Sequence, residues 1–183
     1  MKIEKSTHPN ILYNEIGSPI NFSLKNFHSV GTSHFYSKGN EEVGILENSR
    51  CNLQAYTNGL VLHANISNRI TRIAIKKEKI DKIILTSGNE EVNPTFPSPF
   101  YFALKYGVPL KKAKYFPMIS KYEYINFGKT KLCISFNKID YNFEANFSTF
   151  YALKAFFQRY ILKKKIELKH NLIIKNFNHK IKI

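Results

Sequence analysis

The chain contains no tryptophan, two cysteines, two aspartates and four arginines among its 183 residues. Cys51 and Cys133 lie far apart, form no CxxC pair and lack metal-ligand spacing, so the sequence offers neither a disulfide framework nor a zinc site. Each cysteine falls in an apolar run, and we expect both to be small core residues with free thiols. Without a disulfide framework, a reducing cytoplasmic location is the expected one.

Long apolar segments and catalytic motifs are also missing. No segment approaches the roughly 20 apolar residues that span a membrane, so we expect no transmembrane segment. The eight glycines form neither a GxGxxG nor a P-loop pattern, and the six histidines are scattered without metal-binding spacing. Asp81 and Asp140 fit turn positions, and we expect water to solvate Glu90 and Glu91 in a polar connection. The sequence therefore predicts that the protein is not an enzyme and holds no cofactor or metal.

The net charge of +15 is the most prominent feature of the composition. One interpretation is an acidic partner: an anionic membrane surface, an acidic protein or a nucleic acid. The other is unselected codon bias, because lysine, asparagine, isoleucine, phenylalanine and tyrosine all have AT-rich codons. Arginine, which suits bidentate phosphate recognition better than lysine, is scarce. Composition alone leaves both interpretations open.

Alternating apolar and polar residues predict strands from residue 43 onward. The preceding segment 1–42 is interpreted as an irregular leader with one or two short strands, which its aromatic residues pack on the domain. Asn58-Gly59 predicts a type I′ hairpin turn, in which both central residues need a positive φ. The segment 87–120 contains five of the seven prolines and is interpreted as an insertion, with a short helix at 99–106 that begins after Ser98. The expected strands are 43–47, 51–57, 60–65, 70–75, 82–86, 122–127, 131–136 and 141–145.

An amphipathic helix is expected at 148–162, where Phe150, Leu153 and Phe157 recur at helical spacing. Lys163, Lys164 and Lys165 would then lie in its last turn and complement the helix dipole. The remaining segment 163–183 is interpreted as a basic tail with at most a weak strand. Together these elements predict an α+β fold, mostly an antiparallel β sandwich or open barrel that one C-terminal amphipathic helix caps.

This order resembles that of bacterial PH-like domains of the pleckstrin-homology or GRAM type. The resemblance is carried by the hairpin CNLQAYTNGLVLHAN at 51–65, by RITRIAIKKEKIDKIIL at 69–85 and by the two strands and helix of 131–161. It implies a PH-like domain over 43–162, from which the leader and the 87–120 insertion depart. It also implies a binding module, since some such domains bind acidic lipid headgroups and many bind peptides or proteins.

Three groups of basic residues, within 69–77, 111–114 and 163–165, are candidates for binding an anion. Lysines and aromatic residues interleave at 101–121, which suits either single-stranded nucleic acid or a lipid interface. Alternatively, the aromatic residues pin this loop to the core while the lysines face water, and we expect this second arrangement. We expect a non-catalytic binding or scaffold module at the inner membrane face, with nucleic-acid binding through 101–121 and the tail as the alternative. The candidate anion-binding residues are Arg69, Arg72, Lys76, Lys77, Lys111, Lys112, Lys114, Lys163, Lys164 and Lys165.

Overall fold

The computed structural model describes residues 16–23, 26–29, 31–32, 34–40, 44–66, 69–161 and 165–175. The chain divides into two compact units. Unit 1 comprises Met1–Ser87 and Lys129–Lys169, and unit 2 comprises Gly88–Gly128 and His170–Ile183. In sequence, unit 2 therefore consists of a segment inserted into unit 1 and the C-terminal segment that follows unit 1.

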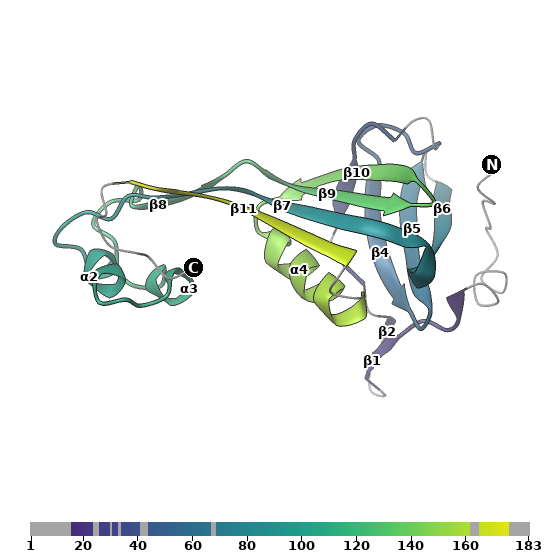
Figure 1. Cartoon of the computed structure of the whole chain (residues 1–183), viewed down its shortest axis with the longest axis horizontal. Helices are drawn as coiled ribbons and strands as arrows, with labels where there is room; N and C mark the ends of the chain where they lie inside the picture. Colours follow the sequence, from purple (N-terminus) through teal and green to yellow (C-terminus); the bar gives the residue numbers. More distant parts are fainter. Residues whose placement is uncertain are drawn as a thin grey trace. The chain divides into compact units, whose positions relative to one another are not determined.

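The strands of the large sheet follow the order β11-β7-β9-β10-β3-β4-β5-β6 (Figure 1). Two of these strands, β7 and β11, begin in unit 1 and end in unit 2. This path ends at β6 and β11, so the sheet is open and does not close into a barrel. The hairpin of β1 (Asn21–Ser23) and β2 (Asn26–Ser29) forms a separate two-stranded sheet. The strands on this path are β3 (Phe35–Ser37), β4 (Arg50–Tyr56), β5 (Gly59–Ile66), β6 (Arg69–Lys76), β7 (Ile80–Val92), β9 (Lys129–Phe136), β10 (Ile139–Asn146) and β11 (Ile166–Ile174). The ninth strand of the large sheet, β8 (Tyr124–Phe127), lies off the path and pairs with β7.

Strand β3 lies within the segment 1–42, where the sequence predicts an irregular leader with one or two short strands. The strand expected at 43–47 does not form in its described part, residues 44–47. Strand β3 pairs antiparallel with β10 on one side and with β4 on the other. The side chain of Asn40 extends the first pairing: its Oδ1 accepts the backbone N–H of Asn142 at 2.8 Å, and its Nδ2 donates to the Asn142 carbonyl at 2.6 Å. The buried side-chain amide of Asn40 thus continues the hydrogen bonding between β3 and β10 beyond the end of β3.

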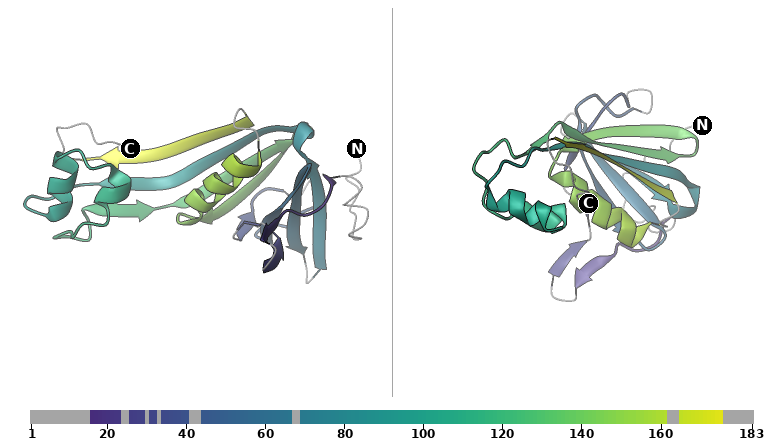
Figure 2. Two further views of the ribbon diagram at one scale, coloured as in Figure 1. Left: turned by 90° about the horizontal axis from the view of Figure 1, so that it is seen from below. Right: turned by 60° about the vertical axis from the view of Figure 1, so that its left-hand side comes forward.

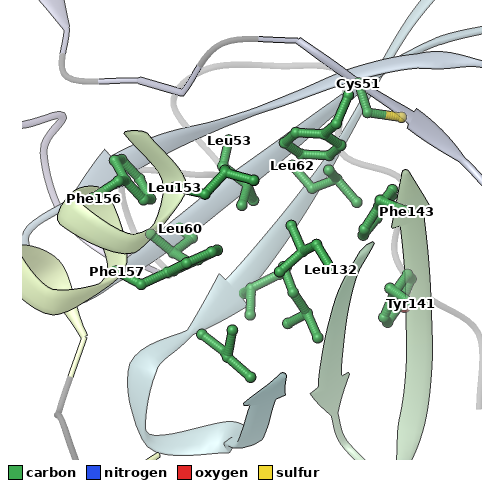
Figure 3. Packing of buried hydrophobic residues seen from close by; sticks show 14 of the residues in the cluster. Cys51, Leu53, Leu60, Leu62, Leu132, Tyr141, Phe143, Leu153, Phe156 and Phe157 are labelled. Atoms are coloured by element: carbon green, nitrogen blue, oxygen red, sulfur yellow. The ribbon is translucent and has the colours of Figure 1, made fainter. Parts of the chain in front are cut away.

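The core of unit 1 lies between this sheet and helix α4 (Thr149–Tyr160). Phe150, Leu153 and Phe157 are buried on the inner side of the helix, as their spacing predicts. Figure 3 shows Leu153, Phe156 and Phe157 directed at side chains of β4 and β5. The predictions of a mostly antiparallel α+β fold and of a packed C-terminal helix are confirmed. The helix ends at Tyr160, however, so Lys165 lies beyond its last turn.

The predicted type I′ turn at Asn58-Gly59 is wrong. Tyr56 pairs with Gly59, and the two-residue loop therefore consists of Thr57 and Asn58, neither of which has a positive φ. Gly59 is required for a different reason, because an added Cβ would lie 2.6 Å from the Ile75 carbonyl oxygen. The hairpin between β9 and β10 has the expected type I′ backbone instead, with φ of 52° at Asn137 and 63° at Lys138.

The segment after α4 forms a full strand, β11, where the sequence indicates a basic tail. Ile166 and Leu168 pack against the core of unit 1, and Leu172 packs against that of unit 2. These three residues lie on one face of the strand, because alternate side chains of a strand point to the same side. His170 interrupts the apolar series on this face, so the sequence shows no clear strand pattern.

Unit 2 contains α2 (Pro99–Lys105), α3 (Leu110–Ala113) and β8 (Tyr124–Phe127), which pairs with the end of β7 (Figure 2). Its small core consists mainly of Val92, Phe100, Leu104, Leu110 and Ala113. As predicted, the hydroxyl of Ser98 caps α2 by accepting the backbone N–H of Tyr101 at 2.9 Å.

Within the described residues, no helix is long and apolar enough to cross a bilayer.

Candidate binding surface

The acidic residues of unit 2 are engaged within the unit, and Glu123 is the clearest case. Its buried carboxylate accepts the Ser98 hydroxyl at 2.5 Å and the backbone N–H groups of Thr95, Ile119 and Ser120 at 2.7–3.1 Å. Burial alone would raise the pKa of Glu123, but these four hydrogen bonds outweigh it and lower the pKa below its ordinary value. Glu123 therefore ties the loop before α2 to the loop before β8.

The expectation that water solvates Glu90 and Glu91 is wrong. Both residues belong to β7, and Glu90 is only 1% exposed. Its carboxylate accepts the Tyr124 hydroxyl at 2.9 Å and lies 3.1 Å from Nε2 of His170. Glu91 pairs with Lys175 at 2.6 Å. These contacts join β7 to β8, to β11 and to the residue after β11, so both carboxylates are engaged within unit 2.

Between residues 92 and 122 the chain has five lysines and no acidic residue. Lys105, Lys111, Lys112 and Lys121 are exposed, and Lys114 is half-buried. Within the described residues, Lys111 and Lys112 form no ion pair with a carboxylate. Lys111 and Lys112 therefore present positive charge that no carboxylate among the described residues pairs with.

The aromatic residues of the same segment do not all pin it to the core. Tyr101 and Phe102 are half-buried, but Tyr106 and Tyr115 are 79% and 81% exposed, and Phe116 is also exposed. The expectation that aromatic residues anchor this loop is therefore wrong for these three. Phe102 and Tyr106 stack with ring centroids 6.4 Å apart. Exposed aromatic rings and exposed lysines therefore occur together in this segment.

Three further exposed apolar residues extend this set. Phe96 is 68% exposed, and Ile119 and Tyr122 are each 61% exposed. The carboxylate of Glu123 holds the backbone next to Phe96 and at Ile119. We call residues 96–122 the aromatic–lysine segment. The pattern missed Phe96 and Ile119, because isolated apolar residues in a proline-rich loop carry no periodicity that reports exposure.

The candidate basic residues are divided between the units. Lys111, Lys112 and Lys114 belong to unit 2, whereas Arg72, Lys76, Lys77 and Lys165 belong to unit 1. Lys163, Lys164 and the side chain of Arg69 lie outside the described residues.

Two of the unit 1 lysines bind backbone carbonyls. Lys77 Nζ donates to the Thr57 carbonyl at 2.9 Å. Lys165 Nζ donates to the carbonyls of Lys77, Glu78 and Ile80, and it thereby fastens the turn between β6 and β7. Both ammonium groups therefore stabilise turns of unit 1 by binding their backbone carbonyls.

Arg72 lies beside a histidine that stays neutral. His63 pairs with Arg72 across β5 and β6, and its Nε2 lies 2.8 Å from Oε1 of Gln54. Burial, followed by the charge of Arg72, lowers the pKa of His63 from 6.5 to about 4. This histidine adds no charge to the basic group near neutral pH.

A shallow depression of about 310 Å³ lies over the outer face of the sheet in unit 1. Its lining includes Lys131, Cys133 and Glu144, and Glu144 also pairs with Lys129. Cys51 is buried as expected, whereas Cys133 is only half-buried on this outer face, and both thiols are free. The mixture of opposite charges makes this depression a weaker candidate for an anion than the aromatic–lysine segment.

In the part of the chain that the structure describes, no group of three His, Cys, Asp or Glu side chains could hold a metal ion. Comparisons with protein families, with curated proteins and with solved structures found no match to this chain.

Proposed function

We propose that the protein is a non-catalytic binding module that engages an acidic partner through the aromatic–lysine segment of unit 2. The observation that carries the proposal is the separation of charge within that unit. Glu90, Glu91 and Glu123 are all bound inside it, while Lys111 and Lys112 are exposed without an ionic partner among the described residues. Unpaired exposed cations attract anions over about a Debye length, roughly 10 Å at 0.1 M salt.

The fold of unit 1 supports a binding role of the PH-like kind. Antiparallel strands followed by one helix packed on the sheet agree with the resemblance that the hairpin at 51–65 and the segment 131–161 carry. PH-like domains bind acidic headgroups in some members and proteins in others, and a fold alone does not choose between these ligands. We therefore assign recognition of the acidic partner to the aromatic–lysine segment, which lies between β7 and β9 and is not part of the PH-like pattern.

Binding to heparin, a polyanion without lipid or bases, tests this proposal. In the variant Lys111→Gln, Lys112→Gln, Lys114→Gln, we expect elution from immobilised heparin at a clearly lower salt concentration than the wild type. The matched control is Lys79→Gln, Lys131→Gln, Lys138→Gln, which removes the same charge from exposed positions of unit 1. The control should elute close to the wild type.

The comparison also separates function from codon bias. If the lysines are an unselected consequence of composition, retention depends on total charge and the two triple variants elute together. That result would refute the assignment to unit 2. Loss of retention in the unit 1 control alone would refute it as well.

A further inference from the structure

We infer that the acidic partner is an anionic lipid bilayer, into whose interface the exposed apolar side chains of the aromatic–lysine segment insert. This inference rests on the proposed function and names its ligand. Lysines supply the attraction to acidic headgroups, and the exposed apolar side chains supply a contact that a purely electrostatic ligand does not require.

The apolar side chains favour a bilayer over a nucleic acid. Phe96 and Ile119 are 68% and 61% exposed, and neither has a polar group that water or a base edge could bind. An exposed isoleucine contributes nothing to base stacking, whereas burial among acyl chains removes its apolar area from water. Unit 2 also contains no arginine, the residue best suited to bidentate phosphate recognition and to stacking on bases.

The contacts between lysines and tyrosines suit the headgroup region. Lys114 Nζ lies 5.6 Å from the ring centroid of Tyr115, and Lys121 Nζ lies 5.2 Å from that of Tyr122. Each cation lies over a ring face on which a base would otherwise stack. At a membrane the same pair is compatible with binding, because tyrosine and lysine both concentrate where acyl chains meet headgroups.

Glu123 fixes the backbone beside Phe96 and at Ile119, so that both apolar side chains have defined positions. Its carboxylate binds the N–H of Thr95, which precedes Phe96, and the N–H of Ile119 itself. Phe96 also packs edge-on against Tyr101 and Phe102, with both pairs of centroids 5.8 Å apart. The backbone beside both apolar side chains is thus held before binding, which lowers the entropy lost at the interface.

The absence of tryptophan from the chain provides a clean insertion assay. The variant Tyr115→Trp carries a single tryptophan at an exposed position, which can be excited selectively over the tyrosines, and Tyr36→Trp is the control at a 46% exposed position of unit 1. Each is mixed at low ionic strength with phosphatidylcholine vesicles, with and without phosphatidylserine. We expect a blue shift and quenching by brominated lipid only for Tyr115→Trp, and only with phosphatidylserine present.

Vesicle sedimentation gives a second readout. Ile119→Ser should bind phosphatidylserine vesicles about tenfold more weakly than the wild type, because it loses the burial of one aliphatic side chain. Its retention on heparin should not change, since no charge is altered. The exposure of Ile119 makes a folding defect unexpected, and circular dichroism checks this point.

The outcomes separate the inference from the proposed function. If the wild type binds heparin or a single-stranded oligonucleotide but not the vesicles, anion binding stands and the membrane inference is overturned. If vesicles bind without a blue shift and Ile119→Ser matches the wild type, insertion is refuted and only headgroup attraction remains. If neither heparin nor vesicles bind, both proposals fail.

Discussion

The hydroxyl of Ser98 donates to the carboxylate of Glu123 at 2.5 Å, and the same hydroxyl oxygen accepts the N–H of Tyr101 at the start of α2. One serine therefore links a helix cap to a buried acid that also binds three backbone N–H groups. The proline-rich loop has few regular backbone hydrogen bonds. Its conformation is fixed instead because several of its backbone N–H groups donate to the single carboxylate of Glu123.

This link predicts a dependence of stability on pH. The folded pKa of Glu123 lies below the ordinary value of 4.5. Its stabilisation is therefore complete above pH 4.5 and is lost as the pH falls through the lower folded pKa. Glu123→Gln should lower the stability of unit 2 near neutral pH and reduce its loss in acid. Hydrogen exchange of the α2 amides at several pH values measures both effects, and identical profiles for the two proteins would contradict the prediction.

Unit 1 should respond to pH over a different range because of His63. Its folded pKa of about 4 lies below the ordinary value of 6.5, so the unfolded chain binds the extra proton first. Stability should then fall as the pH decreases from 6.5 to 4, by about 2–3 kcal/mol in total. His63→Gln removes the titrating group and should flatten this part of the profile. Urea unfolding across that range, followed by far-ultraviolet circular dichroism, decides the point.

The packing of α4 gives a third prediction. Phe157 is fully buried against β4 and β5, as Figure 3 illustrates. Phe157→Ala should lower the free energy of unfolding by about 3–5 kcal/mol, because it leaves a cavity in the core. Gln158→Ala, at the next and exposed position of the helix, should change it by less than about 0.5 kcal/mol. Equal effects in chemical denaturation would show that the helix does not pack as described.

Glu90 gives a fourth prediction, which concerns the attachment of β11. Glu90→Ala removes the acceptor of the Tyr124 hydroxyl and the partner of His170, so it should speed hydrogen exchange along β11 in unit 2. Glu91→Ala removes only the more exposed pair with Lys175 and should have a much smaller effect. If the two variants exchange alike, the buried pair does not anchor the strand.

Periodicity was sufficient for the elements that bury one regular face. The strands around the hairpin at 51–65 and the helix with Phe150 and Phe157 show clear periods, and the structure has them. Strand β3 has only three residues, and its partner β10 lies far along the chain, so no local pattern marks it. The Asn58-Gly59 dipeptide led to a wrong turn type. Gly59 is needed because its backbone lies close to Ile75, and not because the turn requires a positive φ there.

The candidate site was harder to predict than the fold for a physical reason. Glu90, Glu91 and Glu123 look like surface residues in the sequence, since their partners are hydroxyl, imidazole, ammonium and backbone groups from other segments. Only tertiary structure shows that these acids are engaged within unit 2 and that Lys111 and Lys112 have no ionic partner among the described residues. The interleaved lysines and aromatics at 101–121 did mark the region, although not which rings are exposed.

A lysine acetylation footprint of the wild-type chain tests the central claim most directly. Mass spectrometry would compare the modification of each lysine with and without phosphatidylserine vesicles at low ionic strength. We expect protection of Lys105, Lys111, Lys112 and Lys121 in unit 2, with Lys79, Lys131 and Lys138 of unit 1 modified as before. Protection centred on the unit 1 lysines, or spread evenly over all of them, would contradict the claim that the aromatic–lysine segment is the binding surface.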